Sequence, residues 1–190
     1  MGLFDVLTGR SKIKGPAPDR LFAISTAYIA LQSEHQIDPD GSAAIVFQPL
    51  ATSEFEATIR DMEEVVKATG GETGTQVSTT DDSYGYRWMV LRDPEVEDLA
   101  VGINAVSSSI ETSGHGERLL CAVFAFRDAR KQPVYFIYNY KRGSWYPFVP
   151  AGGEQQRSTE RELQLKAQLS GELPMEPELE RWFPLWGIPI

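Results

Sequence analysis

Cysteine, histidine and long apolar runs are all scarce in this chain of 190 residues. The single cysteine, Cys121, forbids a disulfide within the chain, and no apolar run approaches the roughly 18 residues that span a bilayer. The start of the chain also lacks the apolar stretch of a secretory signal, so we expect a cytoplasmic protein. The two histidines, His35 and His115, lie far apart, so no metal site and no cofactor are expected.

Positive charge is also in short supply, because 18 Lys and Arg face 27 Asp and Glu and the formal net charge is −9. A strongly acidic chain repels a phosphate backbone unless its basic residues gather on one face, which disfavours nucleic-acid binding. Residues 1–20 nevertheless carry +2, and the rest of the chain carries −11. The hydrophobic share of 42% and the charged share of 24% are those of an ordinary globular domain.

The first 18 residues are predicted to form a separate segment, ahead of a single domain over residues 19–190. In this segment apolar Leu3, Phe4 and Leu7 precede basic Arg10 and Lys12, and a Gly-Pro-Ala-Pro spacer follows. An apolar and cationic stretch of this kind can lie in an anionic membrane interface, where each basic residue contributes on the order of 1 kcal/mol. It can equally contact a protein partner. The alternative is a frayed start or a strap across the core.

Hydrophobic periodicity predicts an α+β fold, with about four helices covering a largely antiparallel sheet of five or six strands. Asp19 and Asp93 are predicted N-caps, Asp38-Pro39-Asp40-Gly41 fits a type I turn, and Gly70-Gly71 should end the second helix. The apolar run over 118–126 indicates a strand at the sheet centre, followed by an antiparallel meander. The helices are expected over 19–37, 53–69, 93–113 and 158–170, and the strands over 44–48, 76–79, 84–91, 118–126, 134–140 and 145–149.

Signals for catalysis are weak. Asp81 and Asp82 have no second carboxylate cluster beside them in the sequence, and a solvated loop explains them. Ser107–Ser109 and His115 invite a Ser/His interpretation, but no Gly-x-Ser-x-Gly elbow is present and the serines are predicted on a helix. We therefore expect a non-enzymatic protein without catalytic residues, and the rival is a small enzyme that uses these side chains in a cleft.

Two aromatic regions stand out as candidate contact surfaces. One is a hairpin with aromatic arms and a cationic tip at Lys141 and Arg142, a combination that is common in protein interfaces. A core meander with an ordinary polar tip explains it equally well. The other is the C-terminal tail with Trp182 and Trp186, which we expect to dock on its own domain; the alternative is an anchor for a partner. The candidate partner-binding or membrane-binding residues are Leu3, Phe4, Leu7, Arg10, Lys12, Lys141, Arg142, Trp182 and Trp186.

Short stretches along nearly the whole chain resemble the actinobacterial family of phage-shock-protein-A-associated proteins called PspAB. Their order and spacing carry the resemblance, and Asn139 departs from it where a more apolar residue is expected. In order, they are Met1-Gly2-Leu3-Phe4-Asp5 with Gly9-Arg10, Ser83-Tyr84-Gly85-Tyr86 with Trp88, Asn104-Ala105-Val106-Ser107-Ser108-Ser109, Leu119-Leu120-Cys121, Tyr140-Lys141-Arg142-Gly143 with Tyr146-Pro147-Phe148, Gly171-Glu172-Leu173-Pro174, and Arg181-Trp182-Phe183-Pro184-Leu185-Trp186-Gly187.

The resemblance implies an accessory protein of the envelope-stress system built around phage shock protein A (PspA), a membrane-associated coiled-coil scaffold. It implies a protein partner, either the PspA-like scaffold or an M48-type membrane protease, and a location at the inner face of the cell membrane. It carries no catalytic residue over to this chain. A third hypothesis is a secretion-chaperone-like α+β module that holds client segments on its sheet, for which a large exposed aromatic groove would be the sign.

Overall fold

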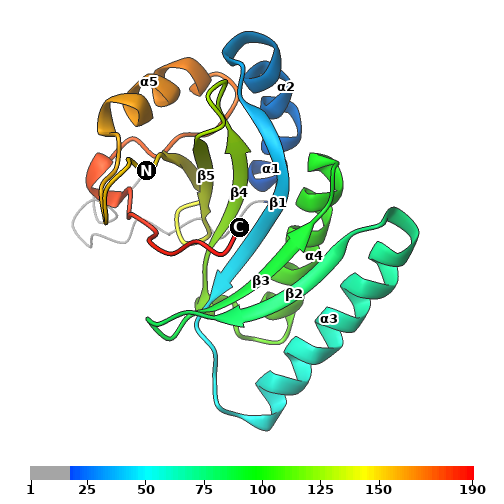
Figure 1. Ribbon diagram of the computed structural model, residues 1–190. Helices are drawn as coiled ribbons and strands as arrows, with labels where there is room; N and C mark the ends of the chain where they lie inside the picture. The colour runs from blue at the N-terminus through cyan, green and yellow to red at the C-terminus, as the bar shows by residue number, and fades with distance from the viewer. Residues whose placement is uncertain (1–17) are drawn as a thin grey trace, which may run out of the picture.

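The computed structural model describes residues 18–190, which form one six-stranded antiparallel sheet with helices packed on it (Figure 1). The strand order is β2-β3-β1-β4-β5-β6, so β1 and β4 occupy the centre. The apolar run over 118–126 predicted this place for β4. The last three strands form the expected antiparallel meander. The strands are β1 (Asp38–Phe47), β2 (Gln76–Asp81), β3 (Arg87–Arg92), β4 (Leu119–Arg127), β5 (Pro133–Asn139) and β6 (Ser144–Phe148).

Four helices of eleven residues or more accompany the sheet, which confirms the predicted α+β class. The first predicted helix is divided in two, because the chain bends at Phe22 and Ala23. The second runs past Gly70-Gly71, which do not end it. The helices are α1 (Pro18–Leu21), α2 (Ile24–His35), α3 (Ser53–Thr73), α4 (Val96–Thr112) and α5 (Thr159–Leu169), with 3-10 turns η1 (Gly116–Arg118) and η2 (Leu179–Arg181).

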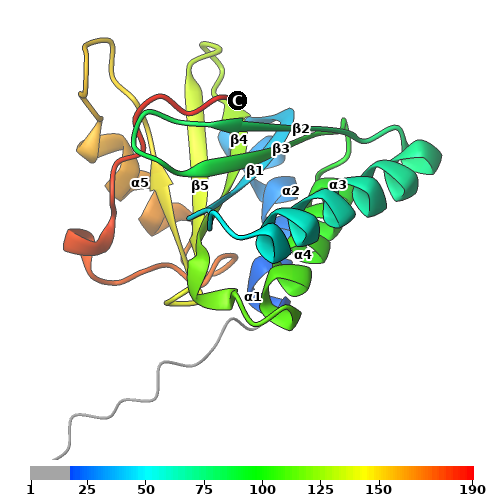
Figure 2. The ribbon, with the colours of Figure 1, turned by 90° about the horizontal axis from the view of Figure 1, so that it is seen from below.

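Alternation along each strand divides the core into two layers, because successive side chains point to opposite faces of a sheet. One face carries Ile45, Phe124 and Phe136 and is covered by α2, α3 and α4, while α5 adds Leu165 and Leu169 beside β6. The other face carries a second cluster that includes Val90, Val123 and Ile137. No helix among residues 18–190 covers that second face; the C-terminal tail runs over it (Figures 1 and 2).

The predicted type I turn at Asp38-Pro39-Asp40-Gly41 is wrong, because these residues begin β1. Asp38 and Pro39 pair with Arg127 and Phe126 of β4, and a bulge follows before Ser42. Gly41 has a φ of +69° in the bulge, and Arg127 Nε donates to Asp40 Oδ1 at 2.6 Å. The same Asp-Gly chemistry that suits a turn therefore serves a bulge here, since β4 offers it a partner strand.

Two predicted N-caps are also wrong. Asp19 lies inside α1, and α4 begins at Val96, three residues after Asp93. Asp93 is 4% exposed and instead joins two loops, because its carboxylate accepts from the backbone N–H of Glu95 at 2.9 Å and from the Thr75 hydroxyl at 2.5 Å. An aspartate that bonds the backbone two residues ahead forms a local turn, which here precedes the helix.

Candidate functional site: an aromatic groove

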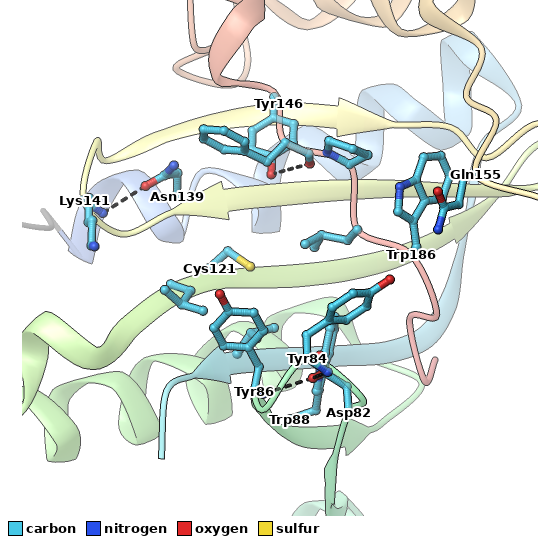
Figure 3. Close-up of a pocket in the computed structure, with 15 residues that line it drawn as sticks. Asp82, Tyr84, Tyr86, Trp88, Cys121, Asn139, Lys141, Tyr146, Gln155 and Trp186 are labelled. Atoms are coloured by element: carbon cyan, nitrogen blue, oxygen red, sulfur yellow. Dashed lines mark hydrogen bonds between the residues drawn. The ribbon is translucent and has the colours of Figure 1, made fainter. Parts of the chain in front are cut away.

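A groove with a volume of about 590 Å³ lies on the sheet face that the tail crosses (Figure 3). We call it the aromatic groove. Its floor is formed by β1 and β4, one wall by the β2–β3 turn, the other wall by the tail, and one end by the β5–β6 hairpin. The lining residues are Val46, Leu120 and Cys121 in the floor, Asp82, Tyr84, Tyr86 and Trp88 on the side of the turn, Phe183, Pro184, Leu185 and Trp186 in the tail wall with Tyr146 of β6 beside them, and Asn139, Lys141 and Gln155 at the ends.

The turn wall is held by Asp82. Its Oδ1 accepts from the backbone N–H groups of Tyr84 and Tyr86 at 2.8 and 3.0 Å, and its Oδ2 accepts from Trp88 Nε1 at 2.9 Å. Gly85, with a φ of +84°, completes the turn. The strand predicted over 84–91 therefore begins only at Arg87. Tyr84 and Tyr86 lie in the turn before it and are 63% and 37% exposed. By holding the turn in this shape, the carboxylate of Asp82 presents the rings of Tyr84 and Tyr86 to the groove.

The tail wall is fastened by side chains of β6 and by Arg157, which precedes α5. The Trp182 ring is 5% exposed and stacks on Tyr146 with centroids 6.1 Å apart, and the Tyr146 hydroxyl donates to the Phe183 carbonyl at 3.0 Å. Arg157 Nη1 donates to the Trp182 carbonyl at 2.7 Å. The Trp186 ring meets Phe148 edge-on at 5.2 Å. The tail thus docks on its own domain, as expected, while Phe183 stays 58% exposed beside the groove.

The start of the tail extends the sheet edge. Residues 174–176 pair with β6, because Trp145 N–H donates to the Pro174 carbonyl and Glu176 N–H donates to the Trp145 carbonyl. Glu176 is 2% exposed, and its carboxylate accepts from the Ser144 hydroxyl at 2.8 Å. This buried anion is flanked by the guanidinium of Arg142, whose Nε lies 3.4 Å from Glu176 Oε2. The tail therefore leaves the sheet edge at a defined place.

The hairpin tip forms one end of the groove. Asn139 Oδ1 accepts from the backbone N–H of Lys141 at 3.0 Å, so the polar residue that departs from the resemblance caps the tip. Arg142 pairs with Glu176 and Glu178 and thereby belongs to the tail attachment. Lys141 is exposed, lines the groove, and takes part in no ion pair with residues 18–190.

The floor holds the cysteine in an unreactive setting. Cys121 is 6% exposed, and burial among apolar side chains raises the pKa of its thiol to about 12. A thiol must ionise to attack an electrophile or to bind a metal, so this one remains a protonated part of the groove floor at physiological pH.

The structure does not bring the side chains of the rival enzymatic hypothesis together. Asp81 forms an ion pair with Arg87 at 2.7 Å, and hydrogen bonding to Arg87 lowers the pKa of its carboxyl. Ser107 is 4% exposed on α4, on the other side of the sheet from the groove, and donates to the Asn104 carbonyl at 3.1 Å. His115 packs edge-on against a phenylalanine of α3. Within residues 18–190, no cluster of three His, Cys, Asp or Glu could hold a metal.

The residues predicted to contact a partner or a membrane fall into three groups. Leu3, Phe4, Leu7, Arg10 and Lys12 lie outside the described residues. Lys141 and Trp186 line the groove. Trp182 and Arg142 hold the tail in place behind it, and Trp182 is too deeply buried to meet a partner while the tail is docked.

Sequence reasoning missed Tyr84, Tyr86 and Phe183 as groove residues. The alternation in Tyr84–Leu91 predicted a strand through both tyrosines. The Asp-Ser-Tyr-Gly sequence ahead of Tyr86 was the signal for a turn instead, because aspartate bonds the following backbone N–H groups and glycine accepts a positive φ. Phe183 adjoins Trp182 and was only read as part of the docked tail.

The comparisons with known proteins concern the whole chain. The family described as "PspAB: PspA associated protein B" matches residues 1–190. No curated protein and no solved structure gives a significant match. Among residues 18–190, no helix has both the length and the apolar character needed to cross a membrane.

Proposed function

Because the chain belongs to the PspA associated protein B family, we propose that it is a non-enzymatic accessory protein that binds a PspA-type partner near the cytoplasmic membrane. The family description supplies the link to PspA. The adaptor role, the place of binding and the site are our proposal.

The observation that carries the proposal is the aromatic groove. Interfaces are enriched in tyrosine, tryptophan and phenylalanine, and hydrophobic grooves that accept a segment of a partner are a recurring mode of recognition. Tyr84, Tyr86 and Phe183 expose 63%, 37% and 58% of their surface around it. Such a cluster on a protein of −9 net charge is a good candidate for a surface that a partner covers. An M48-type membrane protease is the alternative partner that the family resemblance implies.

Binding to purified PspA, measured by isothermal titration calorimetry, tests this proposal. The double variant Tyr86→Ser with Phe183→Ser removes two exposed rings and keeps both groups of the hydrogen bond from the Tyr146 hydroxyl to the backbone carbonyl of residue 183. We expect at least a tenfold loss of affinity, because two interface aromatics are typically worth more than 1.4 kcal/mol. Val101→Ser is the matched control, since Val101 is 53% exposed on α4 at the helix-covered face. Equal binding by both variants would refute the groove as the PspA site.

The membrane part of the proposal rests on the apolar and basic residues of segment 1–14. Deletion of residues 1–14 should leave the melting temperature unchanged and should reduce flotation with vesicles that contain anionic lipid. A lost melting transition would identify the segment as a structural strap. Unchanged flotation would remove the membrane from the proposal.

A client-binding, secretion-chaperone-like role is the second candidate, because the groove is open and aromatic. The two roles differ in what is bound. A chaperone-like module should suppress aggregation of several unfolded proteins, whereas an accessory protein should bind folded PspA and ignore them.

A further inference from the structure

One acidic and one basic residue line the aromatic groove. Of its lining residues only Asp82 and Lys141 are ionisable acids or bases with a charge at neutral pH. Asp82 accepts two hydrogen bonds from backbone N–H groups of the turn and one from Trp88 Nε1 of β3, so both of its carboxylate oxygens are engaged within the turn wall. Lys141 has no carboxylate partner among residues 18–190, and only its backbone N–H is fixed, by Asn139. The one positive charge of the groove therefore lies at the hairpin end, where no carboxylate among residues 18–190 pairs with it.

The far end of the groove offers no charge. Trp186 and Gln155 lie there, and between the two ends the floor consists of Val46, Leu120 and Cys121 (Figure 3). A bound segment thus contacts an apolar floor, aromatic walls and a cation at one end. The chain as a whole carries excess negative charge, and of the residues that line the groove only Lys141 can attract a carboxylate of the occupant.

We propose that the aromatic groove binds an extended partner segment in which apolar side chains are followed or preceded by an acidic residue, and that this carboxylate pairs with Lys141. This specificity rests on the proposed role as a partner-binding protein. The pairing sets the register of the segment and places its acidic end at the hairpin tip, because every alignment that leaves the carboxylate on the apolar floor is penalised.

The test uses the full-length protein as bait for a library of random twelve-residue peptides displayed on phage. We expect the enriched peptides to combine leucine or aromatic residues with Asp or Glu at one end. Synthetic copies of them should bind Lys141→Glu at least tenfold more weakly, and Lys141→Arg nearly as well as the natural protein. Lys67→Glu is the matched control, since Lys67 is also exposed but lies on α3 at the helix-covered face.

Several results would overturn the proposal. They are enrichment of basic or uncharged apolar peptides, absence of any enrichment, binding that Lys141→Glu does not weaken, and equal weakening by Lys67→Glu. Competition by a peptide of residues 1–14, which are apolar and basic, would show that the segment of this chain is the occupant and would also overturn it.

The peptide experiment is independent of PspA. If acidic apolar peptides bind in the Lys141-dependent manner while PspA does not bind, the partner assignment fails and the chemistry of the groove stands. If PspA binds with full affinity to Lys141→Glu, the partner assignment stands and the groove chemistry fails.

Discussion

Replacement of Trp182 by alanine is the sharpest test of how the tail is attached. The ring is 5% exposed and stacks on Tyr146, Lys166 Nζ lies 5.5 Å from the ring centroid, and Nε1 donates to the Glu176 carbonyl at 3.1 Å. The substitution removes the stack, the cation contact and the donor together. It also leaves a cavity beneath the tail wall of the aromatic groove.

The expected loss is about 3–5 kcal/mol of unfolding free energy, which is typical for a buried tryptophan truncated to alanine. Aromatic stacking supplies about 0.5–1.5 kcal/mol of it, and the carbonyl of Glu176 left without its donor adds about 1–3 kcal/mol. In a domain of this length each kcal/mol lowers the melting temperature by about 2–4 °C, so a fall of about 6–20 °C should follow. Trp182→Phe keeps a ring on Tyr146 and should cost about 1–3 kcal/mol.

Urea denaturation followed by circular dichroism measures these losses, and Leu179→Ala is the control, because Leu179 is 47% exposed in the neighbouring turn. Its loss should stay below about 1 kcal/mol. A Trp182→Ala protein as stable as the control would refute the docked tail. If that protein also lost PspA binding, Trp182 would be an interface residue and the tail would be mobile in solution.

Three further predictions follow from buried groups. Cys121 should not react with a thiol reagent at pH 8 in the native state and should react fully in urea, because its thiol has a pKa of about 12; prompt native reaction would contradict the buried floor. Gly102→Ala, a change that favours a helix by about 1 kcal/mol, should instead destabilise by about 1–3 kcal/mol, since the new methyl meets the core side chain of Leu91; a raised melting temperature would disprove this. Glu162→Ala should cost about 3 kcal/mol or more in urea denaturation, because it breaks an ion pair whose carboxylate is buried; a loss no larger than that of Glu63→Ala, whose side chain is 24% exposed, would contradict it.

Most of the regular structure could be predicted because its signals are local. The stripe of apolar residues in α4 and the alternation in β5 and β6 each follow from the geometry of one element. Among the predictions that failed are those at Asp19, Asp38–Gly41 and Asp93, where short polar side chains suit several local conformations. Pairing with β4 turned Asp38–Gly41 into the bulged start of a strand. A hydrogen bond from Thr75 made Asp93 a link between two loops.

The candidate site was predicted in fragments. Lys141 and Trp186 were recognised as exposed or aromatic features, but neither was linked to the other. Tyr84 and Tyr86 were assigned to a strand face, although the bonds to Asp82 place them in a turn. Nothing in the sequence shows that residues near 84, 120, 141 and 185 meet, because their spacing carries no period that either a helix or a strand would produce.

By itself the sequence determined the fold class, the antiparallel meander, the family resemblance and the excess of negative charge. These depend on composition and on periods of two or about 3.6 residues, which the backbone imposes within a single element. Only the tertiary structure decided that the tail closes one wall of a groove, that Asp82 and Arg142 serve structural contacts, and that Lys141 has no ion-pair partner among residues 18–190. Those outcomes depend on side chains from distant segments competing for the same partners, and that competition is settled only when the segments pack together.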